Sequence, residues 1–414
     1  MLTIFKECCF RMKINPILLP LLFIVATANS ADSLTLEQRI QALENQQDSH
    51  GLLKEHSTLS ERFVFSGFGS FSASQLTENA KGPSGETDRL SVDSHSMMGL
   101  QLEVQLSPTT RTVGQIVAEG NEDFTPEIEW LFIEQQLHPS TAIKIGRFGY
   151  PVYSESSNGK VAYSYPTVAL NDEVYIRSLV ESIDGISLDS SYRFANWGTT
   201  LTVYGGERDV EKNREMLKVE SKGVYGFSLE AYNGPWDFQV GWHLVGKSTT
   251  FFYNIDISSS NPTCTPGVDC FLVLPMKNKQ WQASAKYQNG DWYIAYEGST
   301  LSSDNAFVGD ILGQSLTLAY SIETIQPYLQ WGAYSTKLDS SKVETQTNNR
   351  QQQSLTFGVR HDFQPNVSLK YQAKYIYGLE DSYGLFNYYS ADPVDFDDAW
   401  VFDISLQFAF NSLL

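Results

Sequence analysis

The chain has few cysteines and no long apolar run. Only Cys264 and Cys270 lie beyond the first thirty residues, and five residues separate them in a Ser- and Pro-rich stretch. In an exported chain this spacing predicts a disulfide within a loop, and no histidine lies nearby to complete a metal site. No stretch reaches the roughly 18 apolar residues that a membrane helix needs. A membrane location would therefore require strands and not helices.

Basic residues are also scarce. The chain has 29 Lys and Arg against 48 Asp and Glu, a formal net charge of −19. So acidic a chain is a poor candidate for binding nucleic acid. The charge suits a surface facing saline water or an aqueous lumen that favours cations, although ordinary solubility would also account for it.

Catalytic motifs are absent as well. There is no G-x-S-x-G, no H-E-x-x-H and no Walker-type loop, and the six histidines are scattered along the chain. The acidic stretch from Asp392 to Asp398 lacks the spacing of an EF-hand and is interpreted as a solvated loop. We expect no enzyme activity, no cofactor and no bound metal.

The N-terminus has the organisation of an export signal. Ile17 to Ala26 is a ten-residue apolar run, and a basic segment precedes it with Lys6, Arg11 and Lys13. Small residues follow, so we predict a signal peptide over 1–31, cleaved between Ala28 and Ala31. Met12 is an alternative start, because the segment from Met12 onward already has every part of a short signal.

Residues 32–60 form a separate region with helical periodicity. Leu36, Ile40 and Leu43 fall at i, i+4 and i+7, with polar residues between them. One interpretation is a short periplasmic coiled-coil stalk on an oligomer. The other is a frayed linker, because a helix covering barely two heptads is marginal alone.

From residue 61 to the end, apolar residues recur with a period of two. This pattern predicts sixteen strands, which cover 62–71, 88–106, 111–120, 126–137, 142–149, 184–193, 198–205, 223–232, 236–246, 279–288, 292–301, 314–321, 325–335, 352–362, 367–378 and 399–410. In the last strand, every second residue from Trp400 to Phe410 is apolar. An apolar face of about eleven residues suits a tilted strand that crosses a bilayer.

The connections between these strands alternate in length. Seven are short and mostly rich in Pro, Asn or Gly, and longer ones lie between them. Trp197, Trp236 and Trp292 lie beside short turns, whereas Trp130, Trp281 and Trp400 lie toward the opposite strand ends. Short turns at one end and aromatic residues at both interfaces are typical of a transmembrane barrel. We therefore predict an all-β, 16-stranded antiparallel transmembrane β-barrel, with a short N-terminal helical stalk.

The face opposite the apolar residues is polar and would line a water-filled interior. On it we predict five charged pore-wall residues, which are Lys286, Arg360, Lys370, Lys374 and Asp403. The connection from 149 to 183 is long enough to stay outside or to fold into the lumen. If it folds inward, it would narrow the pore with Lys160, Asp172, Glu173, Arg177, Glu181 and Asp184. Its carboxylates would then face the wall bases across the pore and create a transverse field.

Several segments resemble Gram-negative outer-membrane general porins, in particular the porins of marine gamma-proteobacteria with an N-terminal coiled coil. The matching residues are Gly146-Arg147-Phe148, Pro151, Val161 to Pro166, Glu173-Val174-Tyr175 and Asp184-Gly185, together with Phe63 to Gly69 in the first strand. The resemblance implies a homotrimeric, passive channel in the outer membrane with its third loop folded inward. It also implies outer-membrane lipid, lipopolysaccharide and the barrel-assembly machinery as partners. Porins usually end on the aromatic residue of the last strand, whereas here four residues follow Phe410.

We expect passive diffusion of small hydrophilic solutes and ions through this channel. The alternatives are a channel specific for a sugar, oligosaccharide or organic acid, and a non-conducting structural or adhesin barrel. The side on which Arg147 lies is open, since its parity places it on the lipid face and its charge favours the lumen.

Overall fold

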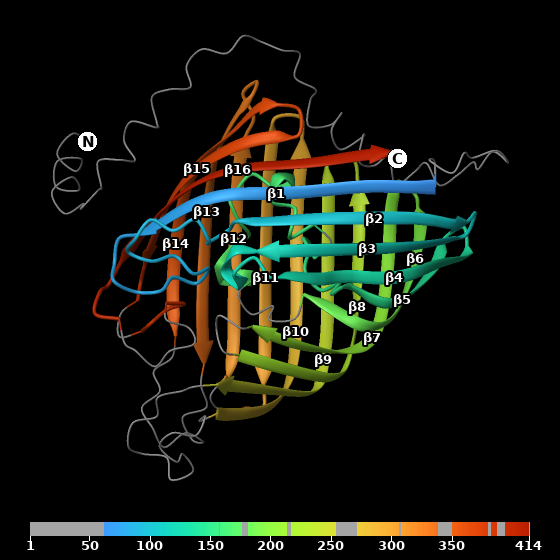
Figure 1. The fold of residues 1–414 in the computed structure, drawn as a ribbon, viewed down its shortest axis with the longest axis horizontal. Coiled ribbons are helices and arrows are strands. Elements are labelled where there is room, and N and C mark those ends of the chain that lie inside the picture. Colours follow the sequence, from blue (N-terminus) through green and yellow to red (C-terminus); the bar gives the residue numbers. More distant parts are fainter. Residues whose placement is uncertain are drawn as a thin grey trace.

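A single closed barrel accounts for nearly all the regular structure. The computed structural model describes residues 62–156, 158–175, 181–212, 217–253, 271–305, 308–337, 350–379, 382–386 and 394–413. Each strand pairs with its neighbours in the chain, and β1 pairs with β16 to close the sheet (Figure 1). The predicted 16-stranded antiparallel barrel is therefore confirmed.

The strands are β1 (Phe63–Leu76), β2 (Met97–Ser107), β3 (Thr110–Glu119), β4 (Pro126–His138), β5 (Thr141–Gly149), β6 (Ser182–Phe194), β7 (Trp197–Lys212), β8 (Leu217–Asn233), β9 (Trp236–Tyr253), β10 (Phe271–Asn289), β11 (Trp292–Ser303), β12 (Asp310–Tyr320), β13 (Ile325–Lys337), β14 (Gln351–Gln364), β15 (Val367–Tyr377) and β16 (Ala399–Leu413). Three short helical turns interrupt the connections, namely η4 (Gly120–Glu122), η5 (Ala162–Ser164) and α3 (Asp172–Tyr175). In this described part of the chain, no helix has both the length and the apolar character needed to cross a membrane.

Several strand boundaries differ from the sequence expectation. The second strand begins at Met97 and not near residue 88, because His95 takes a φ of 59° that breaks the extended conformation. The strands β7 to β10 are longer than predicted, with 16 to 19 residues each. The added ends of β7 and β8 carry mainly polar and charged residues, which do not follow the apolar alternation from which the strands were predicted. The added start of β10, from Phe271 to Met276, is apolar without alternation.

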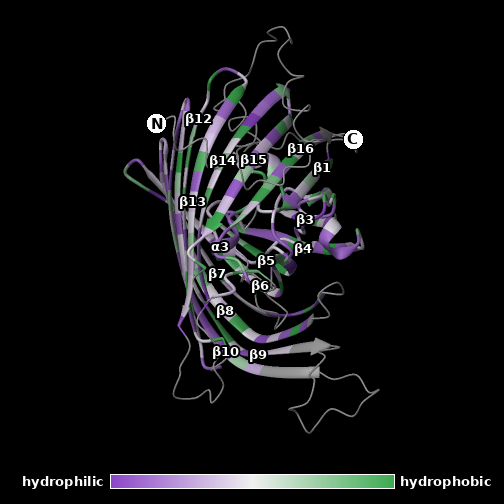
Figure 2. Ribbon diagram, turned by 90° about the vertical axis from the view of Figure 1, so that its left-hand side faces the viewer, coloured by the Kyte–Doolittle hydropathy of each residue, from purple (hydrophilic) through white to green (hydrophobic). Residues whose placement is uncertain are grey.

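The two faces of the barrel wall differ in polarity, as period two requires. On β2, Met98, Leu100 and Leu102 are 39 to 46% exposed on the outer surface. Gln101 and Glu103 alternate with them and point inward. The same alternation of apolar and polar bands follows the other strands (Figure 2). An apolar exterior around a polar interior is the arrangement expected of a barrel in a membrane.

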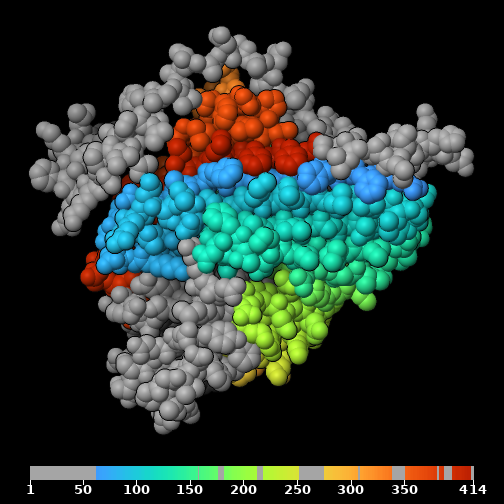
Figure 3. All heavy atoms as spheres, viewed as in Figure 1, coloured from blue at the N-terminus to red at the C-terminus, as the bar shows by residue number. Residues whose placement is uncertain are grey.

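The last strand continues beyond Phe410. Asn411, Ser412 and Leu413 remain paired with β1, opposite Ser66, Phe65 and Val64. Three of the four residues that follow Phe410 are therefore part of the seam that closes the barrel. Figure 3 shows the outer surface beside this seam, where β1 and the strands that follow it form one continuous wall.

Some predictions lie outside the described residues. These are the signal peptide over 1–31, the stalk over 32–60, the disulfide between Cys264 and Cys270, and the position of Arg177.

Candidate channel interior

The long connection between β5 and β6 spans residues 150–181, and its described parts, 150–156 and 158–175, lie inside the barrel. We call it loop 3. Its helical turn α3 contacts the inner faces of β11, β12 and β13, and η5 contacts β1 and β16. Figure 2 shows α3 within the ring of strands. The loop therefore touches strands on several sides of the lumen.

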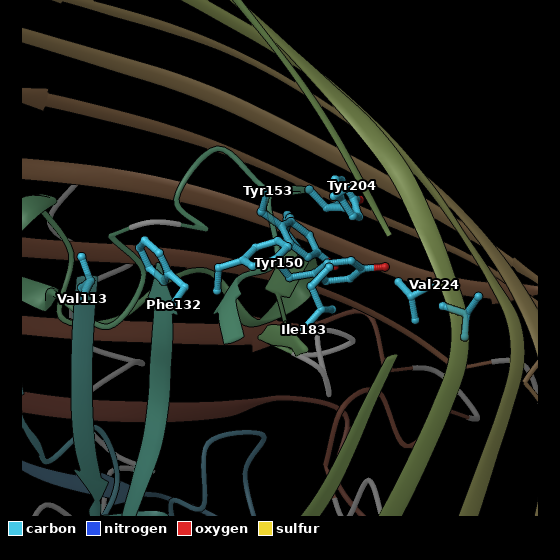
Figure 4. Close-up of a cluster of buried hydrophobic side chains, with 11 residues drawn as sticks. Val113, Phe132, Tyr150, Tyr153, Ile183, Tyr204 and Val224 are labelled. Atoms are coloured by element: carbon cyan, nitrogen blue, oxygen red, sulfur yellow. The ribbon is translucent and has the colours of Figure 1, made fainter. Parts of the chain in front are cut away.

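The first residues of loop 3 pack into an apolar cluster on the inner wall. Tyr150, Val152 and Tyr153 join side chains of β3 to β9, including Phe132 and Tyr204 (Figure 4). The ring centroids of Tyr150 and Tyr204 are 5.6 Å apart in an edge-on arrangement. The hydrophobic burial of these aromatic side chains holds the first residues of loop 3 against the inner wall of a largely polar lumen.

Further along, a wall lysine binds the backbone of the loop. Lys370 on β15 is fully buried. Its ammonium group donates three hydrogen bonds to carbonyl oxygens of loop 3, those of Ala162, Tyr165 and Thr167 at 2.8, 2.5 and 2.8 Å. An ammonium has three donors, so this set satisfies all of them.

Arg360 on the neighbouring strand β14 binds the same part of the loop. Its guanidinium donates to the carbonyl oxygens of Tyr163 and Tyr165, at 2.7 and 3.3 Å. It also lies 4.5 Å from the ring centroid of Tyr163 and pairs with Asp362 at 3.0 Å. Both predicted wall bases thus hold the loop and do not stand free in the lumen.

The predicted loop acids are also in contact with the wall. Asp172 accepts a hydrogen bond from Lys374 at 2.8 Å, and Glu173 lies 3.5 Å from the same ammonium. Gln352 donates to Glu173 at 2.7 Å. Burial raises the pKa of Asp172, but the charge and hydrogen bond of Lys374 outweigh it and lower that pKa below its usual value. These acids and bases were expected to face each other across the pore, and that expectation is wrong because they form direct contacts.

A second ion pair joins the loop to β10. Lys286 contacts Glu155 of loop 3 at 2.6 Å. On β11, Glu297 accepts a hydrogen bond from Tyr175 at 2.6 Å and another from Ser154. Loop 3 therefore has polar contacts with β10 and β11 as well as with β14 and β15.

Lys160, in the first half of loop 3, pairs with Glu181 at its end. Lys160 contacts both Glu119 of β3 and Glu181. Burial lowers the pKa of Lys160, but the charges of Glu119 and Glu181 more than compensate and raise it well above its usual value. The Lys160 ammonium therefore stays charged over the whole physiological range.

Asp184 was expected in the constriction loop and does not lie there. It belongs to β6, where it pairs with Arg147 through two hydrogen bonds of 2.7 and 2.9 Å. Ile186 and Leu188 have the same parity on β6 and are exposed on the outside of the barrel. The pair therefore lies on the outer face, and the opposite charge of Asp184 is what permits Arg147 on that face.

Loop 1, residues 77–96, closes over loop 3. Its Ser84 donates to Asp172 at 2.9 Å. Its His95 contacts Glu86 at 3.1 Å and lies 4.0 Å from Asp403 of β16. We call these contacts of Ser84, Glu86 and His95 the loop 1 latch. Asp403 was predicted on the pore wall and does point inward, but it is covered by loop 1.

A second set of charges lies on the inner wall and is not among the five predicted pore-wall residues. Arg111 of β3 lies between Glu103 and Glu134, at 3.1 and 2.8 Å. Lys144 of β5 lies between Glu134 and Asp189, at 3.9 and 2.7 Å. We call these five residues the charge ladder. Strand parity alone places them inward, so the alternation that identified the other wall residues would have found them.

Comparison with known proteins informs the fold. No family model matches the chain, and no curated protein matches its sequence. Among solved structures, OmpT of Vibrio cholerae has a TM-score of 0.55 at 12% identity, covering 87% of this chain and 100% of that one. OmpF of Salmonella typhi, in complex with daunomycin, has 0.54 at 11%, covering 85% and 99%. The anion-selective porin of Comamonas acidovorans has 0.54 at 13%, covering 84% and 99%. At these identities the likeness concerns architecture, and the chain has the fold of Gram-negative outer-membrane porins.

Proposed function

We propose that this protein is an outer-membrane porin through which small hydrophilic solutes and ions diffuse passively. The observation that carries the proposal is the combination of an apolar outer wall with a polar inner wall, and a long loop held within the lumen. A barrel of sixteen strands is wide enough for an aqueous channel. Loop 3 would set the width of that channel.

The proposal includes the cellular setting. The protein would reach the outer membrane through a cleavable signal peptide and work as a homotrimer, with lipopolysaccharide around it. The OmpT neighbour is described in a trimer form, which supports this assembly by analogy. No chemical step is proposed, since the sequence lacks the motifs of the hydrolases.

We further propose a modest preference for cations. The loop and wall clusters hold more carboxylates than bases, as where Lys160 meets both Glu119 and Glu181. An excess of negative charge along a narrow aqueous path raises the local cation concentration. A channel specific for one solute remains the main alternative within the same class.

A narrow or non-conducting barrel is the second candidate, and one observation favours it. Inward residues of β14 to β16 such as Ser354, Ser405 and Gln407 have no exposed surface. Loop 3 and its neighbours fill that side of the lumen, so any open path lies nearer the other strands. A structural or adhesin barrel would have no such path at all.

The decisive experiment is single-channel recording of the purified, unboiled protein in a planar bilayer, with and without candidate sugars. A porin predicts large ohmic currents that open in three steps and are insensitive to sugars. Small currents blocked by one solute would identify a specific channel. Absence of current from a correctly folded barrel would contradict the proposal and favour the structural alternative.

A further inference from the structure

The charge ladder crosses five adjacent strands in one row. Along β2 to β6 the charges follow as Glu103, Arg111, Glu134, Lys144 and Asp189. Consecutive members are 2.7 to 3.9 Å apart at their nearest charged atoms. Arg111 binds Glu134 through two nitrogens, at 2.8 and 3.0 Å. This two-point contact fixes the orientation of the guanidinium as well as its position.

The ladder faces the part of the lumen that loop 3 leaves accessible. The side chains of Arg111 and Lys144 are 26 and 28% exposed, whereas Lys374, which binds loop 3, is 9% exposed. On the outer side of the same strands, the apolar Ile133 and Ile145 are 50 and 54% exposed. Because side chains alternate between the two faces of a strand, the exposed surface of the charge ladder faces the lumen and not the membrane.

Alternating charges at this spacing largely cancel. Each base lies within 4 Å of two carboxylates, which is well inside the screening length of about 8 Å at physiological salt. An ion passing along this wall meets three acids and two bases, and the net field is that of about one negative charge. The acidic character of the wall is thus mostly hidden by Arg111 and Lys144.

We infer that Arg111 and Lys144 are the residues that limit the ion selectivity of the channel, by neutralising the carboxylates of the charge ladder. The inference rests on the proposed channel function. If Arg111 is replaced, both Glu103 and Glu134 lose an ion-pair partner and face the permeating ions. Without Lys144, the same happens to Asp189. In either case the wall doubles its net negative charge.

The contacts of loop 3 make a weaker contribution to selectivity. Asp172 and Lys374 are bound to each other, and the side chain of Glu173 is fully covered. Ions therefore meet these groups less directly than they meet the ladder. The wall formed by β2 to β6 would therefore determine ion selectivity, and loop 3 would determine the width of the channel.

The test is the reversal potential of the full-length protein in a planar bilayer under a KCl gradient. The variants are Arg111→Gln and Lys144→Gln. Each should raise the permeability ratio of K⁺ to Cl⁻ about seven-fold, since the loss of one positive charge near the path lowers the energy of K⁺ and raises that of Cl⁻ by about RT each. Lys337→Gln is the matched control, because Lys337 lies exposed at the end of β13. It changes the net charge equally and should leave the ratio unchanged.

A double variant protects the test against misfolding. Glu103→Gln with Arg111→Gln removes one acid and one base, and should return the ratio to that of the wild type. A heat-modifiable band on an unboiled gel shows that each variant has folded. If Arg111→Gln does not fold, Lys144→Gln and the double variant together still test the inference. Unchanged reversal potentials in conducting variants would overturn the inference and leave the porin proposal standing. A folded wild type that does not conduct would instead overturn the proposed function.

Discussion

At the scale of single residues, the most demanding position is that of Lys370. A buried ammonium is unfavourable unless hydrogen bonds replace its water, and here three backbone carbonyls do so. The acceptor on Ala162 is 208 residues away in sequence. One side chain thus joins β15 to the loop that follows β5, and its loss affects the position of the loop more than the wall.

We predict that Lys370→Met releases part of loop 3. Each of the three carbonyls would lose the hydrogen bond from Lys370, and only that of Tyr165 would keep Arg360 as a donor. The loss should lower the free energy of unfolding by about 2–4 kcal/mol and increase single-channel conductance and open-channel noise. Bilayer recording and urea unfolding in detergent measure the two effects. Lys337→Met is the control, because it removes an exposed lysine. If Lys370→Met had the conductance and unfolding midpoint of the wild type, these hydrogen bonds would not position the loop.

At the scale of elements, a row of glycines brings three strands together. Gly146, Gly185 and Gly206 lie opposite one another on β5, β6 and β7. A Cβ on Gly185 would lie 2.1 Å from the carbonyl oxygen of Gly205, and one on Gly206 would lie 2.4 Å from that of Asp184. The strands therefore pack with no room for a side chain, close to where loop 3 leaves the wall.

We predict that Gly185→Ala weakens the barrel at this row. The added methyl group meets backbone and cannot be relieved by rotation of a side chain, so the expected loss is about 1–3 kcal/mol of unfolding free energy. Tryptophan fluorescence during urea unfolding measures it. The matched control is Gly114→Ala on β3, where the nearest atom to the new Cβ is 3.8 Å away. Equal unfolding midpoints for the two variants would contradict close strand approach as the reason for glycine.

At the scale of the whole molecule, the loop 1 latch makes stability depend on pH. Burial lowers the pKa of His95, but its hydrogen bond with Glu86 and the charges of Glu86, Asp403 and Asp172 raise it to about 9. A raised pKa means that the charged form is favoured in the folded state. The resulting stabilisation is complete below the ordinary value of 6.5, and it is lost as the pH rises through about 9.

We therefore predict that the folded barrel loses thermal stability between pH 6.5 and pH 10. The contribution of His95 is at most about 3 kcal/mol, since each pKa unit corresponds to about 1.4 kcal/mol. The variant is His95→Asn, because asparagine tolerates the φ of 59° at this position. Melting temperatures in detergent should fall less steeply with pH in the variant. Parallel curves for the two proteins would show that His95 does not titrate in this range.

Much of this molecule follows from local chemistry. Side chains alternate between the two faces of any strand, so the sequence alone predicts the sixteen strands and the inward side of Lys286, Arg360, Lys370 and Lys374. Pro and Asn favour the backbone dihedral angles of tight turns, so these residues predict the short connections. These properties need no information about distant parts of the chain.

The tertiary structure decided which groups meet. Loop 3 has no periodic pattern, and its position inside the barrel results from closure, which brings β14 and β15 against residues about 200 positions earlier. For the same reason the acids of the loop contact the wall bases and do not oppose them across water, and Asp184 lies on the outer face with Arg147. Parity gives the side of the wall on which a charge lies, but its partner depends on strand register and loop packing, which are set only when the barrel closes.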